Sequence, residues 1–379
     1  MTHKIYARTS EKRKLSEKLN EKHFRQINLK ATLYNNSYIL PSKDPFKNGL
    51  CPGGVVNNRK EYIESSAWHE GKMACGYDFE DNQIIKKYDK IIYIGFFHNC
   101  WGHVITDNLK KLWYIYTDEF QELIKQGYKL GFISIRNIPL EQNTLRILQL
   151  AGINTSELIH ITQISYVSSI VIPDNSLIYS TIEDIKLYTK EFSQVLNHIK
   201  SQIKPNYSFK KVYFTRTQLN DKRDYGEHEV EKIFEQNGYD IIAPEHYTVD
   251  EQIAILKGCE WFAATEGSVA HNSIFCSSDS NVVIIRKAYY INRTQTVIND
   301  IANLNLTYID CHNSVRAKKD EEWLGPFYLY HNKYLNRFFH IKNEIKPLWL
   351  RKSWYRYRYP IIYNELHSFV FKTYTFITK

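Results

Sequence analysis

Two side chains suited to acid–base chemistry, His103 and Asp107, stand four residues apart in the segment Trp-Gly-His-Val-Ile-Thr-Asp. Four residues is about one helical turn, so both would lie on one face of a helix. A carboxylate beside an imidazole fixes its tautomer and stabilises the imidazolium, which makes a general base at neutral pH. The alternative is structural: an Asp that complements a helix dipole and a His satisfied by a nearby carbonyl. Only two ligands are visible at this spacing, which disfavours zinc.

A second candidate site follows the apolar run Trp-Phe-Ala-Ala at residues 261–264, where Thr-Glu266-Gly267-Ser268 interrupts the pattern. The run predicts a buried strand, and Ser268 is expected to cap a helix that carries Asn272. Residues 282–285 predict the next parallel strand, which completes a βαβ unit. Its turn would direct backbone N–H groups and the positive end of a helix dipole at a phosphate or diphosphate. The alternative is a turn that only joins a strand to a helix.

Charged residues earlier in this half of the chain also lie where a predicted strand ends or a predicted helix begins. Arg216 ends a predicted strand at 210–216, Arg223 lies in a polar loop, and Glu227 begins a predicted helix. Strands at 240–244, 261–264 and 282–285 alternate with helices, so this half of the chain is expected to form a Rossmann-like βαβαβαβ domain. The carboxyl ends of parallel strands meet at one edge of the sheet. We therefore expect the arginines and the glycine turn to form a diphosphate clamp there.

The elements that position His103 and Asp107 show the same rhythm. Strands are expected at 90–95, 129–135, 158–161 and 169–173, and helices at 104–116, 141–152 and 181–203, which together predict a parallel sheet with helices on its faces. His98 and Trp101 follow the first of these strands and are candidates for the acceptor side of a site. The linker 204–208 then predicts three regions: residues 1–205 as an N-terminal Rossmann-like domain with an irregular arm, 206–315 as a second such domain, and 316–379 as a tail.

Composition limits the function classes. The 379 residues carry a net charge of +9 and include 29 Tyr, 19 Phe and 7 Trp, which favours an anionic or sugar-bearing partner. The sequence contains no GxxxxGK[ST], no GxGxxG after a first strand and no GxSxG, which disfavours P-loop enzymes, dinucleotide oxidoreductases and α/β-hydrolases. The basic residues are dispersed apart from those in the tail, so a nucleic-acid-binding protein is the less favoured reading. Six cysteines without a CxxC pair predict reduced thiols.

Localisation is predicted from the apolar segments. The first eight residues lack an apolar stretch, and the longest apolar run, 91–97, is far shorter than the ~20 residues that span a bilayer. We therefore expect a cytoplasmic protein. The tail mixes basic and aromatic residues at 349–360 and 369–379, which suits an anionic membrane surface at the inner face of the plasma membrane. Equally, the tail could pack back onto the fold.

The order of these motifs resembles glycosyltransferase family 61. The counterparts are Tyr-Phe-Thr-Arg216, the loop from Arg223 to Glu227, Gly-Tyr at 238–239, Glu-Gln at 251–252, and Gly267 to Phe275 with Asn272. In the first half, residues 101–107 resemble the family's aromatic-x-His-x-x-x-acid segment. The resemblance covers roughly residues 90–290. The sequence departs from the family at Gly226, where Asn is usual, and at Ser268, where Ala is usual.

The resemblance implies two Rossmann-like domains of GT-B type and an inverting transfer from a nucleotide sugar, UDP-sugar favoured, with no cofactor and no obligatory metal. His103 and Asp107 would be catalytic, whereas Arg216, Arg223, Glu227, Glu266, Gly267, Ser268 and Asn272 would bind the donor. The acceptor would be a glycan or a lipid-linked glycan, in capsular or other surface polysaccharide synthesis. The alternative is a catalytically inactive glycan- or nucleotide-binding protein of the same fold.

Overall fold

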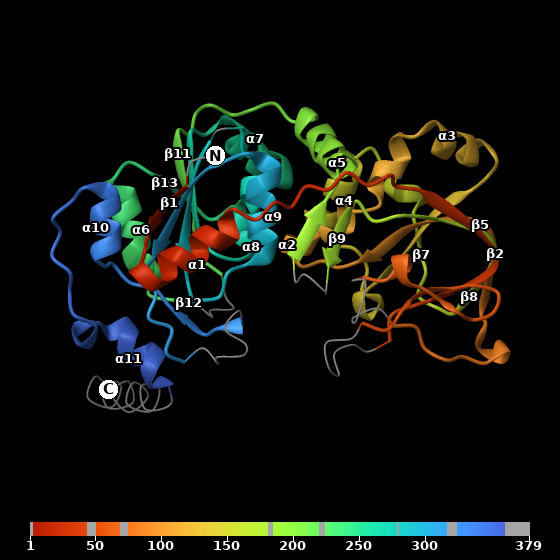
Figure 1. Cartoon of the computed structure of the whole chain (residues 1–379), viewed down its shortest axis with the longest axis horizontal. Coiled ribbons are helices and arrows are strands. Elements are labelled where there is room, and N and C mark those ends of the chain that lie inside the picture. The colour runs from red at the N-terminus through yellow and green to blue at the C-terminus, as the bar shows by residue number, and fades with distance from the viewer. Residues whose placement is uncertain are drawn as a thin grey trace, which may run out of the picture. The chain divides into compact units, whose positions relative to one another are not determined.

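The computed structural model describes residues 3–43, 51–68, 75–180, 185–219, 224–278, 280–316 and 324–360 (Figure 1). The chain forms two compact units: a continuous unit of residues 22–204, and a discontinuous unit of residues 1–21 and 205–379. Each unit is built around its own β-sheet with flanking helices. The expected α/β fold class is therefore confirmed.

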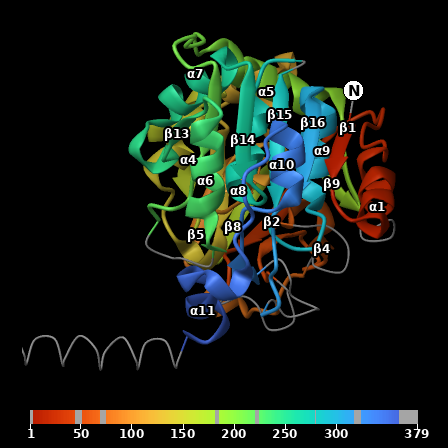
Figure 2. The same cartoon turned by 90° about the vertical axis from the view of Figure 1, so that its left-hand side faces the viewer.

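The discontinuous unit contains a six-stranded sheet in which every pairing is parallel, in the order β1-β16-β15-β14-β11-β13. Figure 2 shows β13, β14, β15, β16 and β1 in that sequence across the unit. Numbered from β11 in chain order, the strands of this half follow the doubly wound order 2-1-3-4-5 with β1 added at the far edge. The order reverses between β11 and β14, which is where ligands bind in such sheets. The strand bounds are β1 His3–Tyr6, β11 Lys211–Phe214, β13 Asp240–Ile242, β14 Trp261–Thr265, β15 Asn281–Arg286 and β16 Asn305–Asp310.

Continuous apolar runs explain why these strands are buried on both faces. Val282 to Ile285 are all fully buried. On one face, Tyr213, Ala263 and Val283 pack in a single cluster with residues of α6 and α10. The helices of this unit are α1 Thr9–Leu19, α6 Glu227–Gln236, α7 Val249–Gly258, α8 Ser268–His271, α9 Arg293–Ala302, α10 Lys333–Phe339 and α11 Lys352–Arg358.

The N-terminal arm belongs to the discontinuous unit, whereas the sequence assigned residues 1–205 to one domain. Strand β1 pairs in parallel with β16 from His3↔Leu306 to Tyr6↔Ile309. The buried Arg286 guanidinium lies 2.7 Å from Asp310 and 3.7 Å from Glu11 of α1. The β1–β16 pairing joins residues about 300 positions apart, so the local sequence pattern cannot predict it. The second crossing of the chain falls between 204 and 205, beside the predicted linker.

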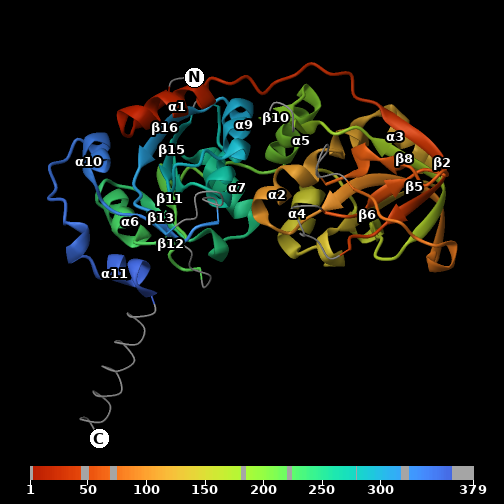
Figure 3. The same ribbon diagram turned by 60° about the horizontal axis from the view of Figure 1, so that its bottom comes forward.

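The continuous unit contains a seven-stranded mixed sheet in the order β4-β3-β2-β8-β5-β6-β7. Figure 3 shows its strands β2, β8, β5 and β6. Strands β8, β5, β6 and β7 are parallel to their neighbours within that set, as expected, but β2, β3 and β4 are antiparallel to theirs. The wholly parallel sheet predicted for this half is therefore wrong at one end. The bounds are β2 Ala31–Leu40, β3 Gly54–Val56, β4 Tyr62–Ile63, β5 Lys86–Phe97, β6 Lys129–Ser134, β7 Ile159–His160 and β8 Ser165–Pro173.

Two predicted helices of this unit differ from the structure. Residues 104–116 do not form one helix: α2 spans Trp101–Val104, and 3₁₀ turns follow at Asp107–Leu109 and Leu112–Tyr116. The helix predicted at 181–203 begins only at Lys190, because Ile185–Tyr188 forms strand β10 against β9, Leu177–Ser180. The remaining helices are α3 Asp118–Lys125, α4 Gln142–Leu150 and α5 Lys190–Ser201.

The described part of the C-terminal tail belongs to the discontinuous unit and packs against its other elements. The buried Arg351 forms an ion pair with Glu229 of α6 and donates a hydrogen bond to the His331 carbonyl. The buried Tyr357 accepts from the Arg316 N–H through its hydroxyl. Residues 361–379, which include the predicted aromatic segment 369–379, lie outside the described residues. Within the described ranges, no helix has the length and apolar character needed to cross a membrane.

Candidate functional site

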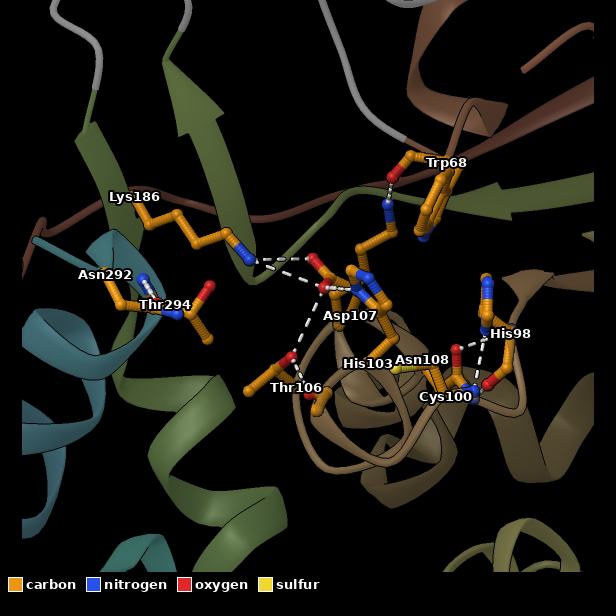
Figure 4. A network of polar contacts seen from close by, with 12 residues as sticks. Trp68, His98, Cys100, His103, Thr106, Asp107, Asn108, Lys186, Asn292 and Thr294 are labelled. Carbon is orange, nitrogen blue, oxygen red and sulfur yellow. Dashed lines mark hydrogen bonds and ion pairs between the residues drawn. The ribbon is translucent and has the colours of Figure 1, made fainter. Parts of the chain in front are cut away.

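The predicted acid–base pair forms in the continuous unit (Figure 4). His103 Nδ1 lies 2.6 Å from Asp107 Oδ2. The contact survives the break in the predicted helix because Thr106, between α2 and the next 3₁₀ turn, donates a hydrogen bond from its hydroxyl to the Gly102 carbonyl. The same hydroxyl lies 3.2 Å from Asp107 Oδ2.

Lys186 is a third member of this cluster that the sequence did not single out. Its Nζ lies 3.2 Å from Asp107 Oδ1 and 3.4 Å from Oδ2. The Lys186 and Asp107 side chains are 8% and 5% exposed, whereas the His103 side chain is 31% exposed. A buried carboxylate needs a cationic or donor partner to remain ionised, and Lys186 supplies one. The sequence did not identify Lys186 because residues 181–203 were predicted to form one helix. In the structure Lys186 lies on strand β10 instead.

This geometry suits proton transfer at Nε2, the ring nitrogen that does not contact Asp107. The proton of the neutral ring resides on Nδ1, where Asp107 accepts it, so Nε2 is the basic nitrogen. When Nε2 takes a proton, the resulting imidazolium is stabilised by the buried carboxylate. The arrangement can therefore accept a proton from a hydroxyl group.

His98 lies beside the pair but is held in a different state. The His98 backbone exchanges two hydrogen bonds with the Asn108 side chain, and its Nδ1 accepts from the Cys100 N–H. Burial, with a smaller contribution from His103, lowers the pKa of His98 to about 4. A conjugate acid with so low a pKa marks a weak base, so His98 is less suited than an unperturbed histidine to take a proton near pH 7.

Aromatic rings surround the two histidines. The Trp68 indole stacks on His98 with centroids 5.5 Å apart and meets His103 edge-on at 4.8 Å. Trp101 is the first residue of α2 and is partly exposed. The sequence predicted Trp101 as an acceptor-side residue but missed Trp68, which lies about 30 residues before the motif and is brought there only by the sheet.

Two of the residues predicted to bind an anion lie close together in the discontinuous unit, at the switch point of its sheet. Arg216 follows β11 and Gly267 follows β14. A Cβ built on Gly267 would lie 3.6 Å from Lys287 Nζ and 4.0 Å from an Arg216 Nη1. Arg216 Nε lies 3.4 Å from Asp224 Oδ2, and Lys287 Nζ lies 3.3 Å from the same oxygen. Two cations therefore gather over the glycine turn, bridged by one carboxylate.

Lys287 is the second residue that sequence reasoning missed. It comes directly after β15 and its side chain is 8% exposed. The pair Arg-Lys at 286–287 ends the apolar run 282–285, and this is the signal that could have identified it, because the carboxyl end of a parallel strand faces the ligand edge. Gly267 has φ 119° and ψ −161°, a conformation that favours glycine and brings the backbone close to both cations.

Glu227 sits beneath these cations as a buried carboxyl group. Its Oε1 accepts from the Tyr213 hydroxyl at 3.0 Å and from the Arg216 N–H at 3.4 Å. Among the described residues, its Oε2 has no hydrogen-bond partner. Burial, and then the nearby Asp224, raises the pKa of Glu227 to about 8. The group is therefore neutral near pH 7 and orients the strand end without repelling an anion.

The other predicted donor-binding residues occupy less direct positions. Glu266 is buried, and its Oε1 accepts from the Asn292 N–H at the start of α9. Asn272 is buried and donates to the Val269 carbonyl. Ser268 was expected to be the N-cap of a helix that carries Asn272. In the structure Gly267 is the cap, and Ser268 is the first residue of α8, which has only four residues. Because a single turn carries little dipole, the cations must supply most of the positive charge.

Arg223 lies outside the described residues, so its predicted place in the clamp stays a prediction. Gly226, where the family usually has Asn, has φ 79°, and a Cβ there would lie 2.1 Å from the Leu329 carbonyl oxygen. The glycine is thus required by the close approach of β17, Phe327–Tyr328, to β12, Asp224–Tyr225. That pairing also positions Asp224. Within the described ranges, no three His, Cys, Asp or Glu side chains are grouped as a metal site would need.

Comparison with known families agrees with this description. Residues 101–283 match the family model described as Glycosyltransferase 61, a range that contains both His103–Asp107 and the Arg216–Gly267 turn. This match supports a glycosyltransferase assignment for a chain of the α/β class. The chain carries a family 61 domain, as the order of its motifs predicted. A comparison with curated proteins found no match.

Proposed function

We propose that this protein transfers a sugar with inversion from a nucleotide-sugar donor, a UDP-sugar favoured, to a glycan or lipid-linked glycan acceptor. The observation that carries the proposal is the gathering of Arg216 and Lys287 over Gly267 at the switch point of a parallel sheet. A donor diphosphate is negatively charged and needs a backbone that it can approach closely. The two cations and the glycine of this turn meet both needs. The product would enter capsular or another surface polysaccharide.

The proposed roles follow from the charges. Arg216 and Lys287 hold the donor diphosphate and neutralise the charge that develops on it as it leaves. Glu227, neutral at physiological pH, keeps the Arg216 backbone in place. Asp224, between the two cations, would exchange part of its ion pairing for the diphosphate when the donor binds.

The proposed chemistry is a single displacement. His103 Nε2 takes the proton of an acceptor hydroxyl while that oxygen forms a bond to the anomeric carbon. The bond from the anomeric carbon to the diphosphate oxygen breaks, and the electron pair leaves with the nucleoside diphosphate. Asp107 stabilises the imidazolium, and Lys186 keeps Asp107 ionised in its buried position. The reaction is proposed to need no metal ion.

A screen of nucleotide sugars tests the proposal, with released nucleoside diphosphate as the readout and anomeric configuration determined by NMR on the product. Transfer or slow hydrolysis of one donor is expected, and Arg216→Ala and Lys287→Ala should weaken binding of that donor's nucleotide. Lys232→Ala, which removes an exposed lysine of α6, is the matched control. Absence of turnover and of nucleotide binding across the panel contradicts the proposal.

The base assignment has a separate test. If His103→Ala and Asp107→Ala both keep near wild-type turnover while Arg216→Ala abolishes it, donor binding stands but this acid–base pair is wrong. Retention of the anomeric configuration in the product would instead exclude the single displacement.

A further inference from the structure

A pocket of about 410 Å³ opens at the end of the discontinuous unit's sheet opposite the anion site. Its lining includes the first residues of β11, β14, β15 and β16, whereas Arg216, Gly267 and Lys287 lie beyond the last residues of their strands. Asn281 begins β15 and Lys287 follows it, six residues further, which corresponds to about 20 Å along an extended strand. The pocket is therefore a separate site, and its volume is in the range of ligand-binding cavities.

Four lining residues form one row across neighbouring strands. Lys211 of β11 pairs in register with Trp261 of β14, which pairs with Asn281 of β15, which pairs with Asn305 of β16. In-register residues of parallel strands project from the same face. All four are partly exposed. Three interstrand spacings make the row about 14 Å long, which is longer than a single sugar ring.

The face that bears this row also carries the aromatic walls of the pocket. Phe338 of α10 meets Trp261 at 6.4 Å and Tyr6 of β1 at 5.8 Å between ring centroids. Lys211 Nζ lies 5.8 Å from the centroid of the Tyr239 ring. The sheet thus presents an indole and further rings beside a lysine ammonium group, and Lys4 adds a second ammonium group to the lining.

The chemistry of the lining selects the ligand. Carboxamides such as Asn281 and Asn305 both donate and accept hydrogen bonds, as sugar hydroxyls do. Aromatic rings supply apolar faces for the C–H face of a pyranose, which buries apolar area while its hydroxyls reach the amides. Lys4 and Lys211 add two positive charges, and no described residue that lines the pocket carries a carboxylate. The complementary ligand is therefore an oligosaccharide that bears anionic groups.

We propose that this pocket binds an acidic oligosaccharide, two or three pyranose units long, at a site distinct from the one that binds the donor. The ligand lies along the Lys211–Trp261–Asn281–Asn305 row, with one acidic sugar next to Lys211 and another toward Lys4 of β1, which lies beyond Asn305 at the other end of the row. Such a site would hold a growing or finished acidic glycan on the enzyme through sugars remote from the reacting end. The proposal does not rest on the proposed transferase activity, since it uses none of the residues assigned to it.

The test is equilibrium binding of trigalacturonic acid to the full chain, followed by tryptophan fluorescence and calorimetry in the presence of saturating UDP. UDP occupies the donor site, so any remaining signal comes from elsewhere. Lys211→Gln is expected to raise the dissociation constant about five- to tenfold, because one partly exposed charge-assisted contact is lost. Lys210→Gln is the matched control, since this adjacent lysine is 78% exposed and does not line the pocket. Trp261→Phe should abolish the fluorescence change and keep binding measurable by calorimetry.

Three results would overturn the proposal. One is the absence of trigalacturonate binding by the wild-type chain. Another is an equal effect of Lys211→Gln and Lys210→Gln, which would indicate non-specific attraction to a basic surface. The third is equal affinity for the neutral trisaccharide maltotriose, which would remove the acidic specificity. Nucleotide binding and donor turnover are measured separately, so their loss or retention does not affect this result.

Discussion

Replacing Glu227 by Gln should change how the stability of the protein depends on pH. The carboxyl group is buried, and burial raises its pKa from 4.5 to about 8. Between these two values the folded state binds more protons at this site than the unfolded state does. The free energy of unfolding therefore falls as pH rises through this window, and its slope from this group is about 1.4 kcal/mol per pH unit.

The size of the effect follows from the window. From pH 5 to pH 7.5 the wild-type protein should lose about 2–3 kcal/mol of unfolding free energy through Glu227. Gln is nearly isosteric and neutral at every pH, and its Oε1 still accepts from Tyr213 and Arg216. The stability difference between Glu227→Gln and wild type should thus grow by this amount up to pH 7.5 and level off above about pH 8.

Urea unfolding at half-unit pH steps from 5 to 9, followed by circular dichroism, measures this difference. Glu235→Gln on the same helix is the control, because Glu235 is exposed and its replacement should leave the pH profile unchanged. The same titration should appear in binding, since ionised Glu227 weakens the attraction of Arg216 and Lys287 for a nucleotide above pH 8. A pH-independent difference between Glu227→Gln and wild type would refute the account of a buried neutral carboxyl group.

Four further substitutions test other parts of the structure. His103→Ala should lower kcat about 10²–10⁴-fold with a smaller change in KM, because the imidazole acts in proton transfer. Steady-state rates on the identified donor and acceptor measure this effect. A change confined to KM would contradict the assigned role. Arg216→Ala and Lys287→Ala should each raise the dissociation constant for the nucleoside diphosphate about 10–100-fold, measured by calorimetry, and unchanged affinity in both would remove the clamp. Gly226→Ala should destabilise the fold by at least about 2 kcal/mol in thermal or urea unfolding. The reason is that the backbone has φ 79° and the new Cβ would lie 2.1 Å from a carbonyl oxygen. An unfolding midpoint equal to that of the wild type would show that the contact relaxes freely.

Local pattern was sufficient for the C-terminal half of the candidate site. Short apolar runs, each closed by a polar or glycine turn, predicted β11, β14 and β15, and the rule that ligands meet the carboxyl ends of parallel strands placed Arg216 beside Gly267. The spacing of four predicted the His103–Asp107 contact even though the helix is broken. Contacts of this kind depend on neighbours in sequence or on a regular topology, so residue types and order are enough to predict them.

Long-range pairing decided the rest. Lys186 reaches Asp107 across 79 residues only because it lies on β10, which pairs antiparallel with β9, where a helix was expected to begin. Lys287 lies near Gly267, and Trp68 lies against His103, because the sheets bring distant segments together. Residues 1–21 belong to the discontinuous unit, where β1 pairs with β16. The row from Lys211 to Asn305 likewise depends on strand register.

The sequence by itself thus determined the fold class, the family resemblance and one residue pair in each candidate site. These pairs are His103 with Asp107, and Arg216 with Gly267. Only the tertiary structure decided which distant cations complete those sites and which carboxyl group is buried enough to stay protonated. The physical reason is that burial and strand register are properties of the whole packed sheet, whereas spacing and apolar runs are properties of a short segment.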